Sequence, residues 1–322
     1  MGKTKISWTD VTWNPVRGCR RVSPGCEHCY AEQVAGRFCG PGQAYEGLAV
    51  RKLRVIDNDE QRSVGRWTGK VRFVAEHLGD PLRWRSPRRV FVNSMSDLFH
   101  EDLTNEQIAA VFGVMAAAPR HTFQVLTKRP ARMREWFRWI GGGEPEVDLV
   151  RLHAQDVLGT LHPALGKNAA SWPLPNVWIG VSVEDQERAD GRIPMLLQTP
   201  AAVRFLSCEP LLEEVNIAAH LLQVVGVDWV IAGCESGFGM RPCNVGWLRS
   251  LRDQCRGAEV PFFLKQAVEL SYTRSVYPSA RAAKVTEHVV ASGPGAKKRG
   301  GGIIELPYLD GVQHAAFPEV RP

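Results

Sequence analysis

The sequence predicts an α/β fold, a partial (β/α) barrel of parallel strands that carries an N-terminal cysteine-rich loop. Short apolar segments recur along the chain and end in polar residues, the pattern of buried parallel strands with a site at their carboxyl ends. Segments with helical signals separate them, among them the capping box of Thr104 and Gln107 and Pro130 at a helix start. Strands that alternate with helices favour a barrel built from βα units, with a doubly wound sheet as the alternative.

The predicted elements follow in order. A first strand lies near Val11, and the cysteine loop 13–31 leads into a helix over 30–38. Strands are predicted to begin near residues 89, 122, 176, 202, 228 and 260, with helices over 108–118, from 130, up to 197 and over 247–255. We interpret 40–88 as an irregular insertion and 141–175 as an inserted excursion. Residues 1–270 then form the barrel-like catalytic domain, and 271–322 form a C-terminal tail that docks on it.

Bulk composition is that of a globular protein, with 44% hydrophobic and 23% charged residues among 322. No apolar run approaches the roughly 20 residues that span a bilayer, and the N-terminus lacks the apolar segment of a signal peptide. We therefore expect a cytoplasmic protein without a membrane partner.

The net charge of +6 is unevenly distributed. Basic residues cluster at 17–21, 51–54, 83–89 and 297–299, which permits a nucleic acid or nucleotide as substrate. The alternative is that these side chains pair with the acidic residues of the chain and only keep it soluble.

Cys19, Cys26 and Cys29 lie close together on a loop broken by prolines and glycines. Three neighbouring thiolates repel one another, so a cation is expected to neutralise them. A structural zinc normally takes four protein ligands, whereas a 4Fe-4S cluster held by three cysteines keeps one iron open for another ligand. We therefore predict a 4Fe-4S cluster. The alternatives are a zinc site completed by His28 or a distant cysteine, unligated thiols, and, least favoured in a cytosolic enzyme, disulfides.

Polar residues follow the predicted strands at the edge where parallel folds place their sites. Carboxylates and lysines facing a common mouth would hold a zwitterionic ligand such as S-adenosylmethionine, whose amino and carboxylate groups would chelate the open iron. One-electron reduction would then cleave its sulfonium to a 5'-deoxyadenosyl radical. The predicted cofactor-binding residues are Asn93, Ser94, Asp97, Ser182, Glu184 and Glu209. The predicted catalytic residues are Lys128, Glu235, Lys265 and Gln266.

The other cysteines are interpreted individually. Cys208 and Cys234 also end strands, where they are expected to be small buried hydrophobic residues, with a fourth ligand or a hydrogen-atom donor as alternatives. Cys39, Cys243 and Cys255 lack mutual spacing that indicates a site.

The combination of the following motifs is specific for one protein family. They are Trp13-Asn14-Pro15, Gly18-Cys19, Ser23-Pro24-Gly25-Cys26, Cys29-Tyr30-Ala31, Val92-Asn-Ser-Met-Ser-Asp-Leu-Phe99, Val125-Leu-Thr-Lys-Arg-Pro130, Gly180-Val-Ser-Val-Glu184, Ser207-Cys-Glu-Pro210 and Glu235-Ser-Gly237. With these motifs, most of the chain resembles the bacteriophage three-cysteine-motif protein family, which is similar to a divergent branch of the radical S-adenosylmethionine superfamily. The resemblance implies a cluster on the three cysteines and a barrel mouth formed by the strand-end residues.

The predicted function is accordingly that of a radical S-adenosylmethionine-type iron–sulfur enzyme of phage origin. It would abstract hydrogen from an unidentified substrate and take its electron from a donor such as a flavodoxin or ferredoxin. A non-catalytic zinc-binding phage accessory protein and a metal-dependent nuclease are the alternatives.

Overall fold

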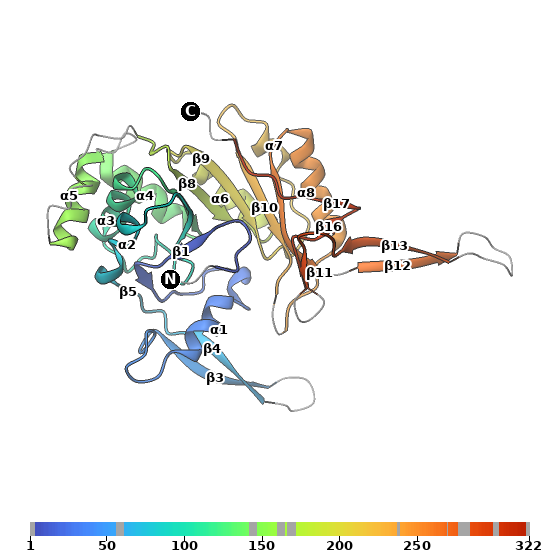
Figure 1. Ribbon diagram of the computed structural model, residues 1–322, viewed down its shortest axis with the longest axis horizontal. Coiled ribbons are helices and arrows are strands. Elements are labelled where there is room, and N and C mark those ends of the chain that lie inside the picture. Colours follow the sequence, from blue (N-terminus) through green and yellow to red (C-terminus); the bar gives the residue numbers. More distant parts are fainter. Residues whose placement is uncertain are drawn as a thin grey trace. The chain divides into compact units, whose positions relative to one another are not determined.

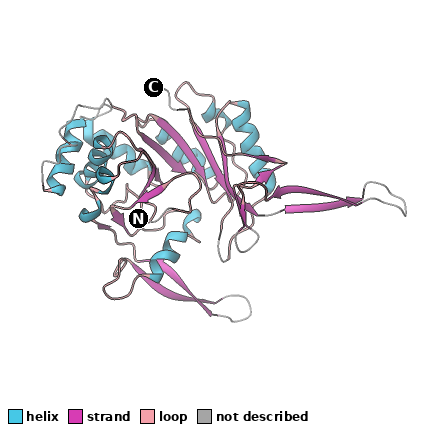
Figure 2. Cartoon of the chain, in the orientation of Figure 1, coloured by secondary structure: helices cyan, strands magenta, loops and turns pink. Residues whose placement is uncertain are grey.

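The computed structural model describes residues 4–55, 61–141, 147–159, 165, 172–236, 239–268, 270–275, 284–298 and 303–319. The fold is mixed α/β, with helices and mostly parallel sheet strands (Figures 1 and 2). The chain divides into two compact units, which we call unit 1 (Met1–Ser182 with Asp190–Phe205) and unit 2 (Val183–Ala189 with Leu206–Pro322). Within the described ranges, no helix has both the length and the apolar composition needed to cross a bilayer.

Four strands of unit 1 lie side by side and run parallel: β1 (Val11–Trp13), β6 (Arg89–Val92), β7 (Thr122–Thr127) and β8 (Val177–Ser182). Their register places Val90 opposite Phe123, and Val125 opposite Ile179. These apolar side chains are buried, as expected of strands that are covered on both faces. The predicted parallel α/β arrangement is confirmed for these strands.

Helices α3 (Asn105–Ala117), α4 (Pro130–Gly141) and α5 (Val147–Leu158) lie near one another in unit 1 (Figure 1). The predicted capping box is confirmed, because Thr104 Oγ1 accepts from the Gln107 N–H at 3.3 Å and the Gln107 side chain accepts from the Thr104 N–H at 3.1 Å. Pro130 is the first residue of α4, as predicted. Helix α5 gives regular structure to part of the segment 141–175, which we interpreted as an insertion.

The segment 40–88 is also more regular than expected. It contains the antiparallel hairpin of β3 (Ala49–Val55) and β4 (Gln61–Trp67), the short strand β5 (Arg72–Phe73) and helix α2 (Asp80–Arg83). The prediction missed the hairpin because its strands are rich in charged residues such as Arg51 and Lys52, both exposed, and lack the apolar run of a central strand.

Unit 2 contains the parallel strands β10 (Trp229–Gly233) and β11 (Phe262–Val268) and the helices α7 (Ala218–Leu221) and α8 (Val245–Gly257). Strand β15 (Ile303–Glu305) pairs antiparallel with β11 and with β14 (Lys297–Lys298). A second sheet joins β12 (Leu270–Ser275), β13 (Lys284–Ala291), β16 (Tyr308–Leu309) and β17 (Val312–Gln313). Strand β9 (Val203–Cys208) and helix α6 (Gln186–Leu197) each contain residues of both units.

Helix α1 (Tyr30–Arg37) follows the cysteine loop directly and packs on strand β4 (Figure 1). The contact is a close approach of two backbones, since a Cβ added at Gly65 would lie 1.8 Å from the Glu32 carbonyl oxygen. Buried Ala31 and Ala35 pack with Tyr45 beside it. Only glycine at position 65 permits this spacing, so the hairpin supports the helix that begins where the cysteine loop ends.

Gly65→Ala is expected to destabilise unit 1 by about 1–3 kcal/mol, because the new methyl group has no space against the α1 backbone. Thermal unfolding and proteolysis of the hairpin would measure this. Gly191→Ala is the matched control: no heavy atom lies within 4 Å of its added Cβ, and alanine in helix α6 should be neutral or stabilising by up to about 1 kcal/mol. Equal behaviour of the two variants would contradict the packing argument.

Candidate functional site

The cysteine loop begins on a fixed support. Strand β2 (Val16–Arg17) pairs antiparallel with β5, and the Val74 N–H donates to the Pro15 carbonyl at 2.7 Å. Gly18 has φ +92°, and a Cβ there would lie 2.2 Å from the Lys70 carbonyl oxygen. The residue before Cys19 therefore has to be glycine, and the backbone that enters the loop is fixed by this contact.

The three loop thiols are near neighbours within unit 1. Cys26 ends the short 3₁₀ turn Pro24–Cys26, and Cys29 occupies the N-cap of α1. The charge of Cys29 influences the pKa of Cys19, and the charge of Cys26 influences that of Cys29. All three are free thiols. The three cysteines predicted as ligands therefore interact electrostatically, and their role as metal ligands stays a prediction.

Burial governs the acidity of these thiols. It raises the pKa of Cys19 to about 12, with a further contribution from the Asp97 carboxylate and an opposing one from Arg129. Burial also raises the pKa of Cys29, although the backbone N–H groups at the start of α1 oppose it. The two thiols keep their protons at neutral pH, and a bound cation would have to displace them.

Glu32, in the first turn of α1, holds the other side of the loop in place. It is almost completely buried, and its carboxylate accepts from Arg21 Nε at 2.9 Å, from Arg66 Nη1 at 3.0 Å and from the Trp67 N–H at 3.2 Å. Arg21 also donates to the Glu27 carbonyl at 2.7 Å. One buried carboxylate therefore connects the cysteine loop, helix α1 and strand β4.

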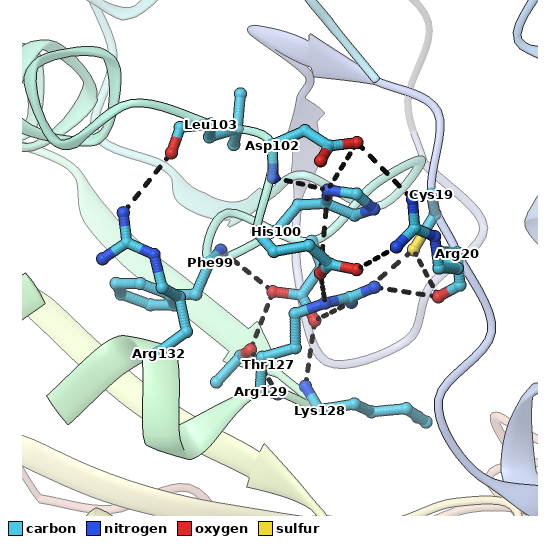
Figure 3. Close-up of polar contacts among 12 residues, drawn as sticks. Cys19, Arg20, Phe99, His100, Asp102, Leu103, Thr127, Lys128, Arg129 and Arg132 are labelled. Atoms are coloured by element: carbon cyan, nitrogen blue, oxygen red, sulfur yellow. Dashed lines mark hydrogen bonds and ion pairs between the residues drawn. The ribbon is translucent and has the colours of Figure 1, made fainter. Parts of the chain in front are cut away.

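Asp97, after strand β6, is a buried carboxylate with four hydrogen-bond donors around it, and Figure 3 labels the residues that supply them, Phe99, Thr127, Lys128 and Arg129. Its Oδ1 accepts from the Phe99 N–H at 3.0 Å and from Thr127 Oγ1 at 2.7 Å. Its Oδ2 accepts from the Lys128 N–H at 3.0 Å and from Arg129 Nη1 at 3.1 Å. The carboxylate connects the ends of β6 and β7, and both of its oxygens are engaged by protein donors.

Arg129 links this network to the cysteine loop. Its guanidinium donates to the Glu101 carboxylate at 2.8 Å and to the Arg20 carbonyl at 2.9 Å, and Nη1 lies 3.9 Å from Cys19 Sγ. Burial alone would lower the pKa of Arg129, but the Asp97 carboxylate and Glu101 raise it. Burial likewise opposes ionisation of Glu101, whose own backbone N–H and Arg129 nevertheless lower its pKa to about 2. A permanent positive charge therefore stands beside the first cysteine.

The end of β6 holds two further predicted residues. Asn93 has φ +60°, a backbone conformation that asparagine tolerates, and its Oδ1 accepts from the Val16 N–H at 3.3 Å. Ser94 donates to Asn14 at 3.2 Å, and its carbonyl accepts from the Tyr30 hydroxyl at 2.8 Å. The Asn93 Nδ2 amide is buried without a hydrogen-bond partner among the described residues. Such a donor is the mark of a ligand position or an ordered water.

Two histidines lie near this region. The His28 side chain is 8% exposed and lies 3.7 Å from the Glu27 carboxylate, so it does not face solvent. His100 is fully buried; its Nδ1 accepts from the Asp102 N–H at 3.2 Å, and burial lowers its pKa. Its Nε2 lacks a partner among the residues that the structure describes.

The other two residues predicted in unit 1 are Lys128 and Ser182. Lys128 joins the Asp97 network through its backbone N–H only, and its side chain points away from the carboxylate (Figure 3). Ser182 ends strand β8 and is buried, and its carbonyl accepts from Arg192 at 2.9 Å.

Unit 2 holds the remaining predicted residues. Glu209 forms an ion pair with Lys265 at 2.5 Å, with both side chains 16% exposed. Gln266 Nε2 donates to the Cys234 carbonyl at 2.8 Å.

Two more predicted residues of unit 2 are buried carboxylates. Glu235 forms a bidentate ion pair with Arg241. Glu184 is completely buried, and its carbonyl accepts from the Leu212 N–H at 2.9 Å. Within this unit Glu209 and Glu235 follow the ends of β9 and β10. Lys265 and Gln266 lie inside β11 and not at its end, because this strand continues to Val268, beyond the end predicted from the sequence.

Many arginines of the basic segments are occupied by intramolecular contacts. In unit 1 the pairs are Arg20 with Glu101, Arg21 with Glu32, Arg83 with Asp80, Arg89 with Asp10, and Arg51 with the Gly36 carbonyl. These contacts favour the structural interpretation of those side chains over phosphate binding.

Sequence reasoning missed the central role of Arg129 and the contribution of Glu101. Arg129 is next to Lys128, the residue predicted at the end of β7. Which of these two neighbouring side chains points inward depends on a difference of one position along the chain. No sequence pattern identifies Glu101 as a functional residue, because it lies in the turn that follows Asp97.

The donor set of the loop fits an iron–sulfur cluster in its chemistry. Three free thiols are electrostatic neighbours. The backbone N–H groups of α1 beside Cys29 and the guanidinium beside Cys19 oppose the effect of burial, which still raises the pKa of both thiols. Among the described residues, no group of three His, Cys, Asp or Glu side chains has the arrangement that would hold a metal ion.

Comparison with known proteins gives a family. Searches of curated proteins and of solved structures found no match. A family model described as "Protein of unknown function (DUF5131)" matches residues 3–318. Because this match covers almost the whole chain, the protein belongs to that family.

Proposed function

We propose that the protein is an iron–sulfur enzyme of the radical S-adenosylmethionine type. The observation that carries the proposal is the presence of three free thiols, those of Cys19, Cys26 and Cys29, on one loop of unit 1, with Cys19 next to the buried guanidinium of Arg129. Three thiolate ligands leave one iron of a 4Fe-4S cluster open, which is where a second molecule would bind.

The cysteine loop would hold the cluster through its three sulfurs. Once reduced by a donor such as a flavodoxin or ferredoxin, the bound cluster would supply the electron that cleaves the sulfonium of S-adenosylmethionine to a 5'-deoxyadenosyl radical. The protein's own contribution is positional. Gly18 and Glu32 fix the two sides of the loop, and Arg129 provides positive charge next to the Cys19 sulfur.

Asp97 acts in this proposal as a positioning residue, since its oxygens already accept four hydrogen bonds from the protein. Asn93 is the better candidate for direct contact with S-adenosylmethionine, because its buried amide has a donor to offer. The roles of Ser94, Ser182, Glu184 and Glu209 as cofactor residues, and of Lys128, Glu235, Lys265 and Gln266 as catalytic residues, remain predictions. So do the partial barrel, the cytoplasmic location and a nucleotide or nucleic acid substrate.

Anaerobic reconstitution with iron and sulfide is expected to load about four iron and four sulfide per chain. Cys26→Ala should lose the cluster, because one of only three protein ligands is removed. Iron analysis and absorption spectra measure this. Cys39→Ala is the matched control, a half-buried thiol outside the loop that donates to the Gly36 carbonyl, and it should load normally. Stoichiometric zinc without iron would contradict the proposal and favour a zinc-binding accessory protein.

Asn93→Asp is expected to weaken S-adenosylmethionine binding by about 5- to 150-fold, equivalent to about 1–3 kcal/mol, with cluster content unchanged. Aspartate retains the oxygen that accepts from the Val16 N–H and tolerates the backbone conformation, but it removes the NH₂ donor. Binding and 5'-deoxyadenosine formation under reduction provide the two readouts. The proposal fails if the loaded wild-type protein forms no 5'-deoxyadenosine, and nicking of DNA with Mg²⁺ by a cysteine-free variant would point to a nuclease.

Asp97→Asn is expected to destabilise the protein by about 3–5 kcal/mol, since it leaves the buried guanidinium of Arg129 without its nearest buried carboxylate. Denaturant unfolding of the metal-free protein measures the effect. The control Asp102→Asn alters a half-exposed carboxylate that lies 3.8 Å from Arg20, and it should change stability by no more than about 0.5 kcal/mol. An unchanged unfolding curve for Asp97→Asn would show that the network does not support the fold.

A further inference from the structure

Two arginines lie directly opposite each other where the chain enters the cysteine loop. Strand β2 pairs antiparallel with β5, and the register sets Arg17 against Arg72. Cross-strand partners in an antiparallel pair project from the same face with their Cβ atoms about 4.5–5.5 Å apart, and like charges in such positions repel each other. The backbone therefore places two guanidinium groups on one face of this strand pair, next to Gly18.

Both side chains are directed at the same turn, at two consecutive residues. The Cζ atom of Arg17 lies 5.8 Å from the centroid of the Tyr45 ring. Arg72 Nη2 donates a hydrogen bond to the Glu46 carbonyl at 2.8 Å. The two guanidinium groups thus converge on one small part of unit 1, and each keeps N–H groups that these contacts do not use.

Neither of these charges has a carboxylate partner. Among the described residues, no carboxylate forms an ion pair with Arg17 or Arg72. The Glu46 carboxylate accepts from a backbone N–H of its own turn instead. Arg20, only three positions after Arg17, is different, because it is paired with Glu101 at 2.9 Å. The opposed arginines therefore retain a repulsion that the described part of the protein does not compensate.

Lys70 adds a third positive charge. A Cβ at Gly18 would lie 2.2 Å from the Lys70 carbonyl oxygen, so the lysine backbone adjoins the residue that follows Arg17. Its side chain is exposed, and no ion pair joins it to a carboxylate within the described ranges. Arg72 is also exposed and Arg17 is half-buried, so a solute can reach this group of side chains.

We propose that Arg17 and Arg72, assisted by Lys70, bind a phosphate group of the substrate. The oxygens of one phosphate can accept from both guanidinium groups at once, which satisfies their open N–H groups and replaces repulsion by two charge-assisted contacts. Phosphate binding itself does not depend on a cluster. Its assignment to the substrate rests on the proposed function, since Arg17 stands two positions before Cys19.

Thermal unfolding of the full-length protein in a series of inorganic phosphate concentrations is the first test. The wild-type protein is expected to gain stability with phosphate, and the Arg17→Gln/Arg72→Gln double variant should gain distinctly less. The general salting effect of phosphate acts on both proteins alike, so only their difference reports the site. If the two arginines served the fold alone, phosphate would raise both unfolding temperatures equally, and that result would overturn the proposal.

A labelled short single strand of DNA or RNA at low ionic strength provides the second test, with fluorescence anisotropy as the readout. The double variant should bind it at least about tenfold more weakly, the effect of losing charge-assisted hydrogen bonds. Arg83→Gln/Arg89→Gln is the matched control, because it removes the same net charge from arginines that are paired with Asp80 and Asp10. An equal loss in this control would assign the attraction to net charge and reject the site.

A nucleoside monophosphate and the single strand distinguish the two sources of the phosphate. For a polynucleotide, affinity falls steeply with salt, and the slope of log affinity against log salt should decrease by about 0.7 for each phosphate contact that the double variant loses. For a nucleotide, both probes should bind the wild-type protein equally and with a shallow slope. Binding of neither probe would refute the proposal.

Each measurement is made before and after anaerobic reconstitution, so that the two proposals are tested separately. Phosphate binding at this site without any 5'-deoxyadenosine formation would contradict the radical function and support the anion site. Formation of 5'-deoxyadenosine by a protein that binds neither phosphate probe would overturn the anion site alone.

Discussion

The buried guanidinium of Arg129 is the interaction on which the candidate site of unit 1 depends. It reaches the Asp97 carboxylate after β6, the Glu101 carboxylate beyond it, and the Arg20 carbonyl and Cys19 sulfur on the cysteine loop. A buried charge is costly unless it is paired and hydrogen-bonded, and here it is both. The requirement to satisfy this one side chain therefore fixes the strand ends and the loop relative to each other.

The fold was predictable where local chemistry decides it. Thr104 and Gln107 form a capping box wherever they precede a helix, and Pro130 suits only a first helical turn, so both helix starts were located from sequence. The hairpin β3–β4 was missed because tertiary contact decides it. The role of Gly65 becomes visible only when the Glu32 carbonyl on α1 lies against it, more than 30 positions away in sequence.

The loop of the candidate site was predictable from sequence, and the contacts around it only in part. The prolines and glycines around Cys19, Cys26 and Cys29 signal a tight loop, and in the structure Cys29 interacts electrostatically with both Cys19 and Cys26. That the three thiols bind a metal stays a prediction. At the end of β7, sequence reasoning chose Lys128, whereas Arg129 makes the buried contacts. Consecutive side chains at a strand end point in different directions, so residue type alone does not identify which one turns inward.

The strand ends of unit 2 carry carboxylates whose ion-pair partners could not be identified from the sequence either. Glu209 is paired with Lys265 and Glu235 with Arg241, so these carboxylates hold the ends of the strands together and are not open to a new partner without loss of an ion pair.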